Sequence, residues 1–440
     1  SLDQNQRQQT HFGVLAYQYS GDGIDVQIAP YLRWTHAHFL PDPQGGELIF
    51  NGADTELSES SLAYGIQADA SYKAGGGHTI RFGLVYQHER TTADTINRVF
   101  RADALGNQLS DVPILIPIGQ RTVANTFGAY LQDEWQLSGA LTLNLGIRYD
   151  HFSRDISEHQ FSPRANLVWK PAPGTTIHMG YARNFTPPPV ALVGTGNLSA
   201  FQGTTGASEV LTADPIRSER EHLFDFGLQQ VVAGHLTLGI DAYYKLKTNL
   251  LDETQFGATE LQAPFNYAKS KGWGVELSAS YENGPVEAYV NVARGEQKAK
   301  KIVSNQFFFE QDELDYIANH YIFTDHSQAW TISGGAALRL KNGLGELQPS
   351  VELIYGSGLR RTDDAPGAVP NGLTQQPYVQ VNLGFAQTFG RDKENAWTLR
   401  FDVTNLFDKI YLVHDGSGVG AGQPQYGPRR AFFAGLRKSF

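Results

Sequence analysis

Residues 307–326, which read FFFEQDELDYIANHYIFTDH, hold the densest group of side chains in the chain that could bind a ligand. Aromatic faces attract cations and flat rings, and carboxylates bind cations directly. We take five residues of this segment as candidate ligand contacts: Phe308, Asp312, Tyr316, His320 and Tyr321. The alternative is a loop whose aromatic side chains pack on one another.

Two adjacent arginines, Arg360 and Arg361, form a second candidate site. A guanidinium presents a planar fork of donors that can hold an anionic chelate by bidentate contacts. Asp363 and Asp364 follow closely, so ion pairs between these neighbours are an equally good interpretation.

No residue pattern indicates catalysis or a bound cofactor. GxSxG, P-loop and HExxH motifs are absent, and a chain with 0 Cys has no thiolate nucleophile, thiolate-bound metal or disulfide. His36 and His38 lie on one face of a predicted strand, but no third metal ligand is evident from the sequence. We interpret them as structural histidines and expect no catalytic residue, no cofactor and no metal site.

Composition excludes other classes of protein. The net charge of −10 argues against a nucleic-acid-binding protein, and 41% hydrophobic residues exclude wholesale disorder. Charged residues make up only 18% of the 440 residues, below the roughly 25% of a soluble domain. No apolar run of about 18 residues is present, but a barrel strand needs only about 9–11 alternating residues. The chain starts at Ser1 without a signal peptide, so we expect a processed or shortened product.

Alternation of apolar and polar residues dominates the sequence. It is clear in residues 140–152, 235–247 and 397–404, where Arg, Asp and Lys recur on the polar side. One apolar and one hydrated face suit a strand between lipid and a water-filled lumen. A large soluble all-β protein such as a propeller is the alternative, but no blade-length repeat is visible.

Short and long connections alternate along the chain. The short ones are turns rich in Gly, Asn and Pro. The long ones are residues 41–59, 91–120, 153–160, 187–217, 252–264, 296–327, 358–377 and 412–428. The pattern predicts a transmembrane antiparallel β-barrel of about 17 strands, with short periplasmic turns and long extracellular loops.

Five segments resemble the TonB-dependent receptor family of Gram-negative outer membranes. They are residues 127–150 (FGAYLQDEWQLSGALTLNLGIRYD), 161–188 (FSPRANLVWKPAPGTTIHMGYARNFTPP), 271–278 (KGWGVELS), 399–411 (LRFDVTNLFDKIY) and 425–440 (QYGPRRAFFAGLRKSF). Terminal Phe440 resembles the aromatic C-terminus of such barrels. The order of the five segments also matches the family, and the resemblance covers nearly the whole chain.

This resemblance implies a single barrel domain over residues 1–440 that lacks the N-terminal plug and the first strands of a 22-stranded barrel. It implies energy-coupled uptake of a scarce nutrient across the outer membrane, with a ferric siderophore favoured as cargo. The implied partners are outer-membrane lipid and lipopolysaccharide, a ferric chelate or other small nutrient, and the periplasmic TonB energy-coupling protein through the missing region. A plugless diffusion porin is the alternative function, and a barrel enzyme is a third that no residue pattern supports.

An odd strand count has a geometric consequence. The first and last strands would run in the same direction, so segments 10–20 and 429–440 should not pair with each other. On the outer face we expect Leu141, Leu143, Leu145, Phe401 and Val403 toward lipid. Trp135, Trp169 and Trp397 should lie in interfacial girdles, and Arg148, Lys245 and Asp402 should face the lumen.

Overall fold

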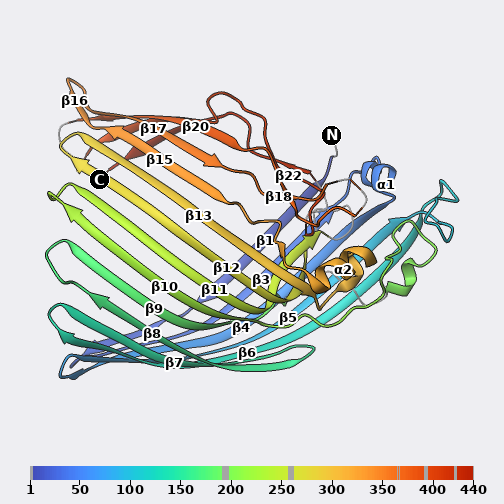
Figure 1. Cartoon of the computed structure of the whole chain (residues 1–440), viewed down its shortest axis with the longest axis horizontal. Coiled ribbons are helices and arrows are strands. Elements are labelled where there is room, and N and C mark those ends of the chain that lie inside the picture. The colour runs from blue at the N-terminus through green and yellow to red at the C-terminus, as the bar shows by residue number, and fades with distance from the viewer. Residues whose placement is uncertain are drawn as a thin grey trace.

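The computed structural model describes residues 3–190, 198–255, 262–363, 365, 367–390, 395–420 and 424–439. Within these ranges, long strands pair into one curved antiparallel sheet (Figure 1). The strands are β1 (Asn5–Val14), β2 (Tyr17–Gly21), β3 (Ile24–Leu40), β4 (Ala53–Gly75), β5 (His78–Val99), β6 (Ile114–Ser138), β7 (Leu141–Ser153), β8 (Ser157–Trp169), β9 (Thr175–Thr186), β10 (Glu219–Val232), β11 (Leu236–Gln255), β12 (Gln262–Asn283), β13 (Val286–Ile302), β14 (Ile322–Phe323), β15 (Trp330–Leu338), β16 (Leu340–Asn342), β17 (Gly345–Gly356), β20 (Tyr378–Phe389), β21 (Trp397–Thr404) and β24 (Ala431–Lys438).

The described sheet makes 17 passes, because β1 with β2 and β15 with β16 are interrupted halves of one pass and β14 only extends the edge of β13. Each pass is antiparallel to the next along the chain, from β3 to β24. The predicted antiparallel barrel architecture is thus confirmed. No described helix is both long and apolar enough to cross a membrane.

Turn chemistry sets the short connections, which gather at one end of the sheet (Figure 1). Between β2 and β3, Asp22 and Gly23 have φ of 52° and 78°. Two consecutive positive φ angles define the tight turn that matches the twist of paired strands, and glycine adopts them without steric cost. The C-terminus lies at this end, and the N-terminus lies at the opposite end with the long connections.

The two faces of the sheet differ as the alternation predicts. Leu145 and Phe401 are each 47% exposed on the outside, and no second sheet formed by the described residues covers them. Trp135, Trp169 and Trp397 are also exposed, and all three lie near the short-turn end. On the inner face, Arg148 pairs with Asp150 at 2.7 Å. Asp402 lines a hollow of about 1070 Å³ on this face, and Lys245 lines a second hollow of about 280 Å³.

Several strands extend further than the sequence predicts. β4 runs over 23 residues, β5 over 22 and β6 over 25. A membrane strand needs only about 9–11 residues, so their upper parts stand outside the membrane-spanning band. Polar pairs such as Thr55 Oγ1–Asn97 Oδ1 at 2.8 Å hold these upper parts together. The predicted loops at 41–59 and 91–120 are therefore partly strand.

One predicted long connection is wrong. Only residues 154–156 join β7 and β8, instead of a loop over 153–160, and the Arg154 amide donates to the Ile156 carbonyl at 3.0 Å. The sequence SRDISEHQ does not alternate between apolar and polar residues, because both faces of the outer end of β8 are polar above the membrane band. That end of the strand therefore could not be recognised from the sequence.

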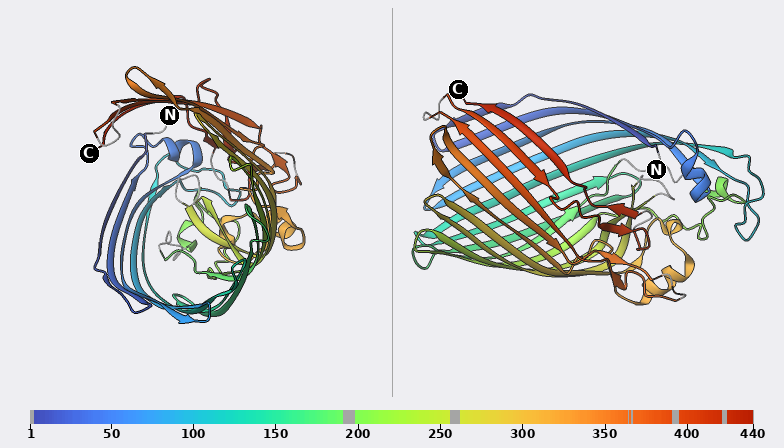
Figure 2. Two further views of the ribbon diagram at one scale, coloured as in Figure 1. Left: turned by 90° about the vertical axis from the view of Figure 1, so that its left-hand side faces the viewer. Right: turned by 90° about the horizontal axis from the view of Figure 1, so that it is seen from above.

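Short elements decorate the outer end. They are helices α1 (Gly46–Asn51) and α2 (Gln311–Asn319), the 3-10 turns η1 (Leu198–Phe201) and η2 (Gln306–Phe308), and the small hairpins β18 (Arg360–Arg361) with β19 (Leu373–Thr374) and β22 (Leu412–Asp415) with β23 (Pro424–Tyr426). Helix α2 lies outside the curved wall (Figure 2). Phe309 and Ile317 pack there on Leu250, Phe265 and Tyr267 of β11 and β12.

The wall has two free edges among the described residues. β1 and β2 pair with β3, β24 pairs with β21, and no described pairing joins the first pass to the last. Seen end-on, the wall curves almost into a ring with these strands at its two edges (Figure 2). The prediction that segments 10–20 and 429–440 do not pair is confirmed for the described residues. Phe440 lies outside them.

Engineered disulfides can test this seam, because the chain has no cysteine of its own. Leu399 and Leu436 are direct cross-strand partners, so Leu399→Cys with Leu436→Cys should cross-link under mild oxidation. Phe12→Cys combined in turn with Phe432→Cys, Phe433→Cys or Leu436→Cys should not cross-link. Mobility on non-reducing gels is the measurement, and efficient Phe12→Cys cross-linking would show that the two edges pair directly.

Candidate functional site

A short edge strand places the candidate site at the outer end of the wall. β14 pairs with β13 through Lys298↔Phe323 and Ala299↔Ile322. The chain then continues alongside β13, where the Thr324 amide donates to the Gln297 carbonyl at 3.2 Å. Asp325 and His326 are thereby held next to the upper ends of β11 and β13.

Asp325 is the most buried member of the site, at 1% exposure. Its Oδ1 accepts from the His326 amide at 2.8 Å and lies 2.6 Å from His326 Nδ1. Its Oδ2 is buried and has no hydrogen-bond partner. A buried carboxylate oxygen without a partner is costly, because it has lost water and gained nothing in return.

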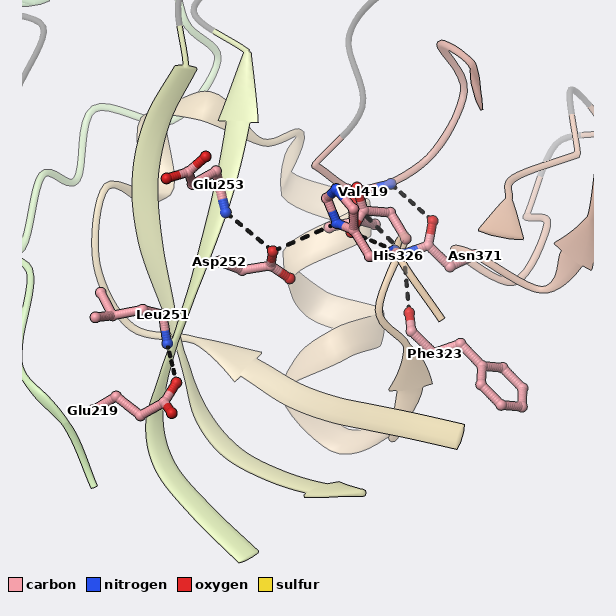
Figure 3. Close-up of polar contacts among 9 residues, drawn as sticks. Glu219, Leu251, Asp252, Glu253, Phe323, His326, Asn371 and Val419 are labelled. Atoms are coloured by element: carbon pink, nitrogen blue, oxygen red, sulfur yellow. Dashed lines mark hydrogen bonds and ion pairs between the residues drawn. The ribbon is translucent and has the colours of Figure 1, made fainter. Parts of the chain in front are cut away.

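Two further segments bring a second imidazole and a second carboxylate. His414 of β22 is 5% exposed, and its ring lies edge-on to that of His326 with centroids 5.4 Å apart. One ligand atom from each of Asp325, His326 and His414 lies within 4.8 Å of the others. Asp252, near the end of β11, has its Oδ1 3.9 Å from His326 Nδ1 (Figure 3).

Asn371 fixes the relative positions of these segments. It is 0% exposed and has a φ of 55°. Its side-chain amide lies between two segments of the chain. Its Nδ2 donates to the Phe323 carbonyl at 2.9 Å, and its Oδ1 accepts from the Val419 amide at 2.9 Å (Figure 3). One buried amide thus ties the segment before Asp325 to the segment after His414.

The electrostatics of the cluster follow from burial and proximity. Burial, together with the neighbouring charge of Asp325, raises the pKa of Asp252 to about 7. The hydrogen bond to Asp325 raises the pKa of His326 to about 9, whereas burial lowers the pKa of His414. At neutral pH the cluster therefore holds one imidazolium among carboxylates, and a bound cation could take the place of that positive charge.

The cluster also borders the lumen. His326 lines the hollow of about 280 Å³ together with Tyr243, Lys245, Glu276 and Thr331. The His326 side chain is 63% exposed and lines this hollow, which gives small solutes a path from the lumen to the cluster.

The predicted ligand residues are not brought together into one pocket. Tyr316 on α2 stacks on His320, just after the helix, with ring centroids 4.4 Å apart, and Asp312 is exposed. Phe308 packs against Phe307 at 4.1 Å. None of the seven predicted residues lines the two lumenal hollows described above.

Tyr321, Arg360 and Arg361 also have other neighbours. Tyr321 lies against the wall, with the Nζ of Lys271 4.7 Å from its ring centroid. Arg360 stacks over Phe323 at 3.4 Å, and Arg361 pairs with Asp415 at 3.8 Å. Asp364, one of the predicted arginine partners, lies outside the described residues.

Sequence reasoning missed most of the Asp–His cluster. In the sequence, Asp325 is only one of several acids in residues 307–326, and no pattern distinguishes Asp252, His326 or His414. The Asp-His pair at 325–326 and the His-Asp pair at 414–415 were the available signals. Nothing in their spacing shows that they meet. The paired residues His36 and His38 instead contact Ser60 and Glu56, each at 3.0 Å.

A large antiparallel wall with an apolar outside, a polar inside and elaborated outer connections defines the class of outer-membrane receptor barrels. The family model "TonB dependent receptor-like, beta-barrel" matches residues 1–406. The chain therefore belongs to the TonB-dependent receptor-like β-barrel family, as its sequence motifs suggest.

Individual relatives agree with this assignment. The TonB-dependent transporter Oar of Myxococcus xanthus is 27% identical over 199 residues, which cover 41% of this chain and 17% of that protein. The ferric yersiniabactin uptake receptor FyuA of Yersinia pestis superposes with a TM-score of 0.69 at 14% identity, covering 98% of this chain and 61% of that one.

Two other solved structures share the fold. The ferric preacinetobactin receptor BauA of Acinetobacter baumannii gives a TM-score of 0.68 at 12% identity, covering 98% of this chain and 63% of that one. The FrpB iron transporter of Neisseria meningitidis gives a TM-score of 0.66 at 14% identity, covering 97% of this chain and 62% of that one. The chain thus spans about three fifths of these solved chains and less than a fifth of the curated relative.

The pKa of Glu313 makes the docking of α2 sensitive to pH. Burial and the charges of Glu310 and Asp312 raise the pKa of Glu313 from 4.5 to about 7. Below pH 7 the docked carboxyl is neutral, whereas the undocked one ionises above about 4.5. Stability of the docked helix should therefore fall as pH rises from about 4.5 to 7 and stay low above it.

Amide hydrogen exchange of α2, corrected for the intrinsic rate at each pH, should show less protection at pH 8 than at pH 5. Glu313→Gln should flatten this dependence, and Asp315→Asn, at an exposed position of the same helix, should not. Equal pH dependence in wild type and Glu313→Gln would exclude this carboxyl as the cause.

Proposed function

We propose that this chain is the barrel portion of a receptor that takes up a scarce nutrient across the outer membrane of a Gram-negative bacterium, with energy supplied through the periplasmic TonB protein. The single observation that carries this proposal is the match of the family to residues 1–406, on a wall with apolar outer and polar inner faces. A ferric siderophore is the proposed cargo. Three of the structurally similar proteins are named for iron or ferric-chelate transport, which supports this choice.

The free edges of the wall support a further part of this proposal. Unpaired N–H and C=O groups cannot face hydrocarbon, because each costs several kcal/mol there. The outer edges of β1, β2 and β24 are therefore proposed to pair with strands outside this chain segment, which would close the barrel around a plug. A gate of this kind separates an energy-coupled receptor from a diffusion porin.

Energy coupling is the sharpest distinction between receptor and porin. In cells that produce the receptor from its native gene, a protonophore should abolish uptake of iron-55 carried by a ferric siderophore. Surface binding of the same chelate should persist, because binding itself needs no energy. Uptake that is insensitive to the protonophore and linear with concentration would identify a diffusion porin instead.

Helix α2 is the proposed first contact for the cargo, since Tyr316 on it stacks on His320, the residue that follows it, and Asp312 beside them is exposed. Tyr316→Ala with His320→Ala should weaken chelate binding to whole cells about tenfold, the loss of about 1.4 kcal/mol. Tyr426→Ala, at an exposed tyrosine of β23, is the matched control. Unchanged binding at equal surface abundance would remove α2 from the cargo site.

A basic patch on the outer wall supports lipopolysaccharide as a partner. Lys269 opposes Lys300, and Lys271 opposes Lys298, on neighbouring rungs of β12 and β13. Their side chains share the outward face with Leu277 and Val290, because strand faces alternate with period 2. Like charges directly opposite each other on neighbouring strands are destabilising. Glu296 pairs with Lys298 at 3.6 Å, and the Tyr321 ring lies against Lys271 and Lys300, so part of this repulsion is already compensated. Anionic lipid phosphates would compensate the rest.

Removal of one rung tests this contact. Lys269→Ser with Lys300→Ser should reduce co-purified lipopolysaccharide phosphate severalfold, whereas Lys341→Ser at the short-turn end should not. Native mass spectrometry in mild detergent is the measurement. Lipid retention equal to wild type would show that the patch does not hold phosphate.

A further inference from the structure

We propose that Asp325, His326 and His414 form a binding site for a divalent transition-metal ion of the zinc class, with the Asp252 carboxylate at its margin. The site is separate from the proposed cargo transport and does not depend on it.

The donor set fits this class of ion. Two imidazoles and one or two carboxylates are ligands that zinc accepts at about 2.0–2.2 Å, whereas Mg²⁺ and Ca²⁺ prefer oxygen ligands alone. Tetrahedral bonds of that length place ligand atoms about 3.4 Å apart. The three ligand atoms already lie within 4.8 Å of one another. Side-chain movements of about 1 Å would bring them to the spacing of tetrahedral zinc ligands.

Unpartnered polar atoms point to a missing ligand. Asp325 Oδ2 is buried without a partner, although Oδ1 of the same carboxylate is well bonded. An ion pair between Asp325 and His326 accounts for the burial of Oδ1, which His326 contacts. It does not account for the burial of Oδ2, which has no partner. The buried hydroxyl of Tyr267 also has no hydrogen-bond partner. Burial, together with the nearby charges of Asp252 and Asp325, raises the pKa of this hydroxyl.

The backbone also leaves room beside Asp325. Gly420 has a φ of 96°, and a Cβ at that position would lie 3.2 Å from Asp325 Oδ2. A glycine there keeps the free carboxylate oxygen clear of side-chain atoms. His326 faces the hollow of about 280 Å³, which provides an entry path for a hydrated ion.

A bound ion would join separate parts of the outer end. The ligands come from the connection between β14 and β15, from β22 and from the end of β11. Figure 3 shows His326 of the first segment beside Asp252 of the last. Asn371 already holds two of these segments in place, so little chain entropy is lost when the ion binds. The ion would therefore stiffen the rim that surrounds the lumen.

The test uses purified protein in detergent, without a histidine tag, stripped with a chelator and dialysed. Titration with Zn²⁺ in a calorimeter should give one site per chain with micromolar or tighter affinity, unaffected by millimolar Mg²⁺. His414→Ala and Asp325→Asn should each weaken Zn²⁺ binding at least tenfold. His235→Ala, at an exposed histidine of the short-turn end, should leave it unchanged.

A second measurement keeps the proposal testable if a variant is poorly folded. In wild type, Zn²⁺ but not Mg²⁺ should increase hydrogen-exchange protection of residues 322–327 and 412–415 together. Barrel integrity is checked for each variant by heat-modifiable mobility on gels. Absence of stoichiometric Zn²⁺ binding by wild type, or equal binding by folded His414→Ala and Asp325→Asn, would overturn the proposal.

Discussion

Backbone pairing between neighbouring strands is the interaction on which the rest of the structure depends. In a membrane-spanning wall the surrounding hydrocarbon offers no hydrogen bonds, so each N–H and C=O must find its partner in the next strand. Once every strand must be paired, the apolar alternation and the tight turns set the register, and the register fixes which side chains face outward. The polar lumen, the exposed Leu145 and the opposed lysines of β12 and β13 all follow from it.

The same constraint explains how much of the fold could be predicted from the sequence. Within the membrane band, alternation has a strict period, so the number of passes and their faces could be predicted. Above the band, water can satisfy either face, and the alternation that marks a strand disappears. The outer ends of β4, β5 and β6, and the tight connection between β7 and β8, were therefore misread as loops.

The candidate site could not be predicted in the same way. Asp252, Asp325 and His414 are far apart along the chain, and only the pairing of β11, β12, β13 and β14 brings the first two together. His414 arrives through a separate hairpin that Asn371 positions. Local composition pointed instead to the aromatic residues of 307–326. A sequence shows where aromatic and acidic residues are concentrated, but it does not show which distant residues meet in the fold.

The fate of that aromatic segment shows how one stretch of chain can serve two purposes. Phe309 and Ile317 cover the outward faces of Phe265 and Tyr267, which would otherwise be exposed to water above the membrane. This packing anchors the segment on the outside of the wall, as Figure 2 shows. After α2 the chain returns along β13 through β14, and this return carries Asp325 and His326 to the end of β11. The apolar contacts of Phe309 and Ile317 thus also help to bring Asp325 and His326 into the polar cluster.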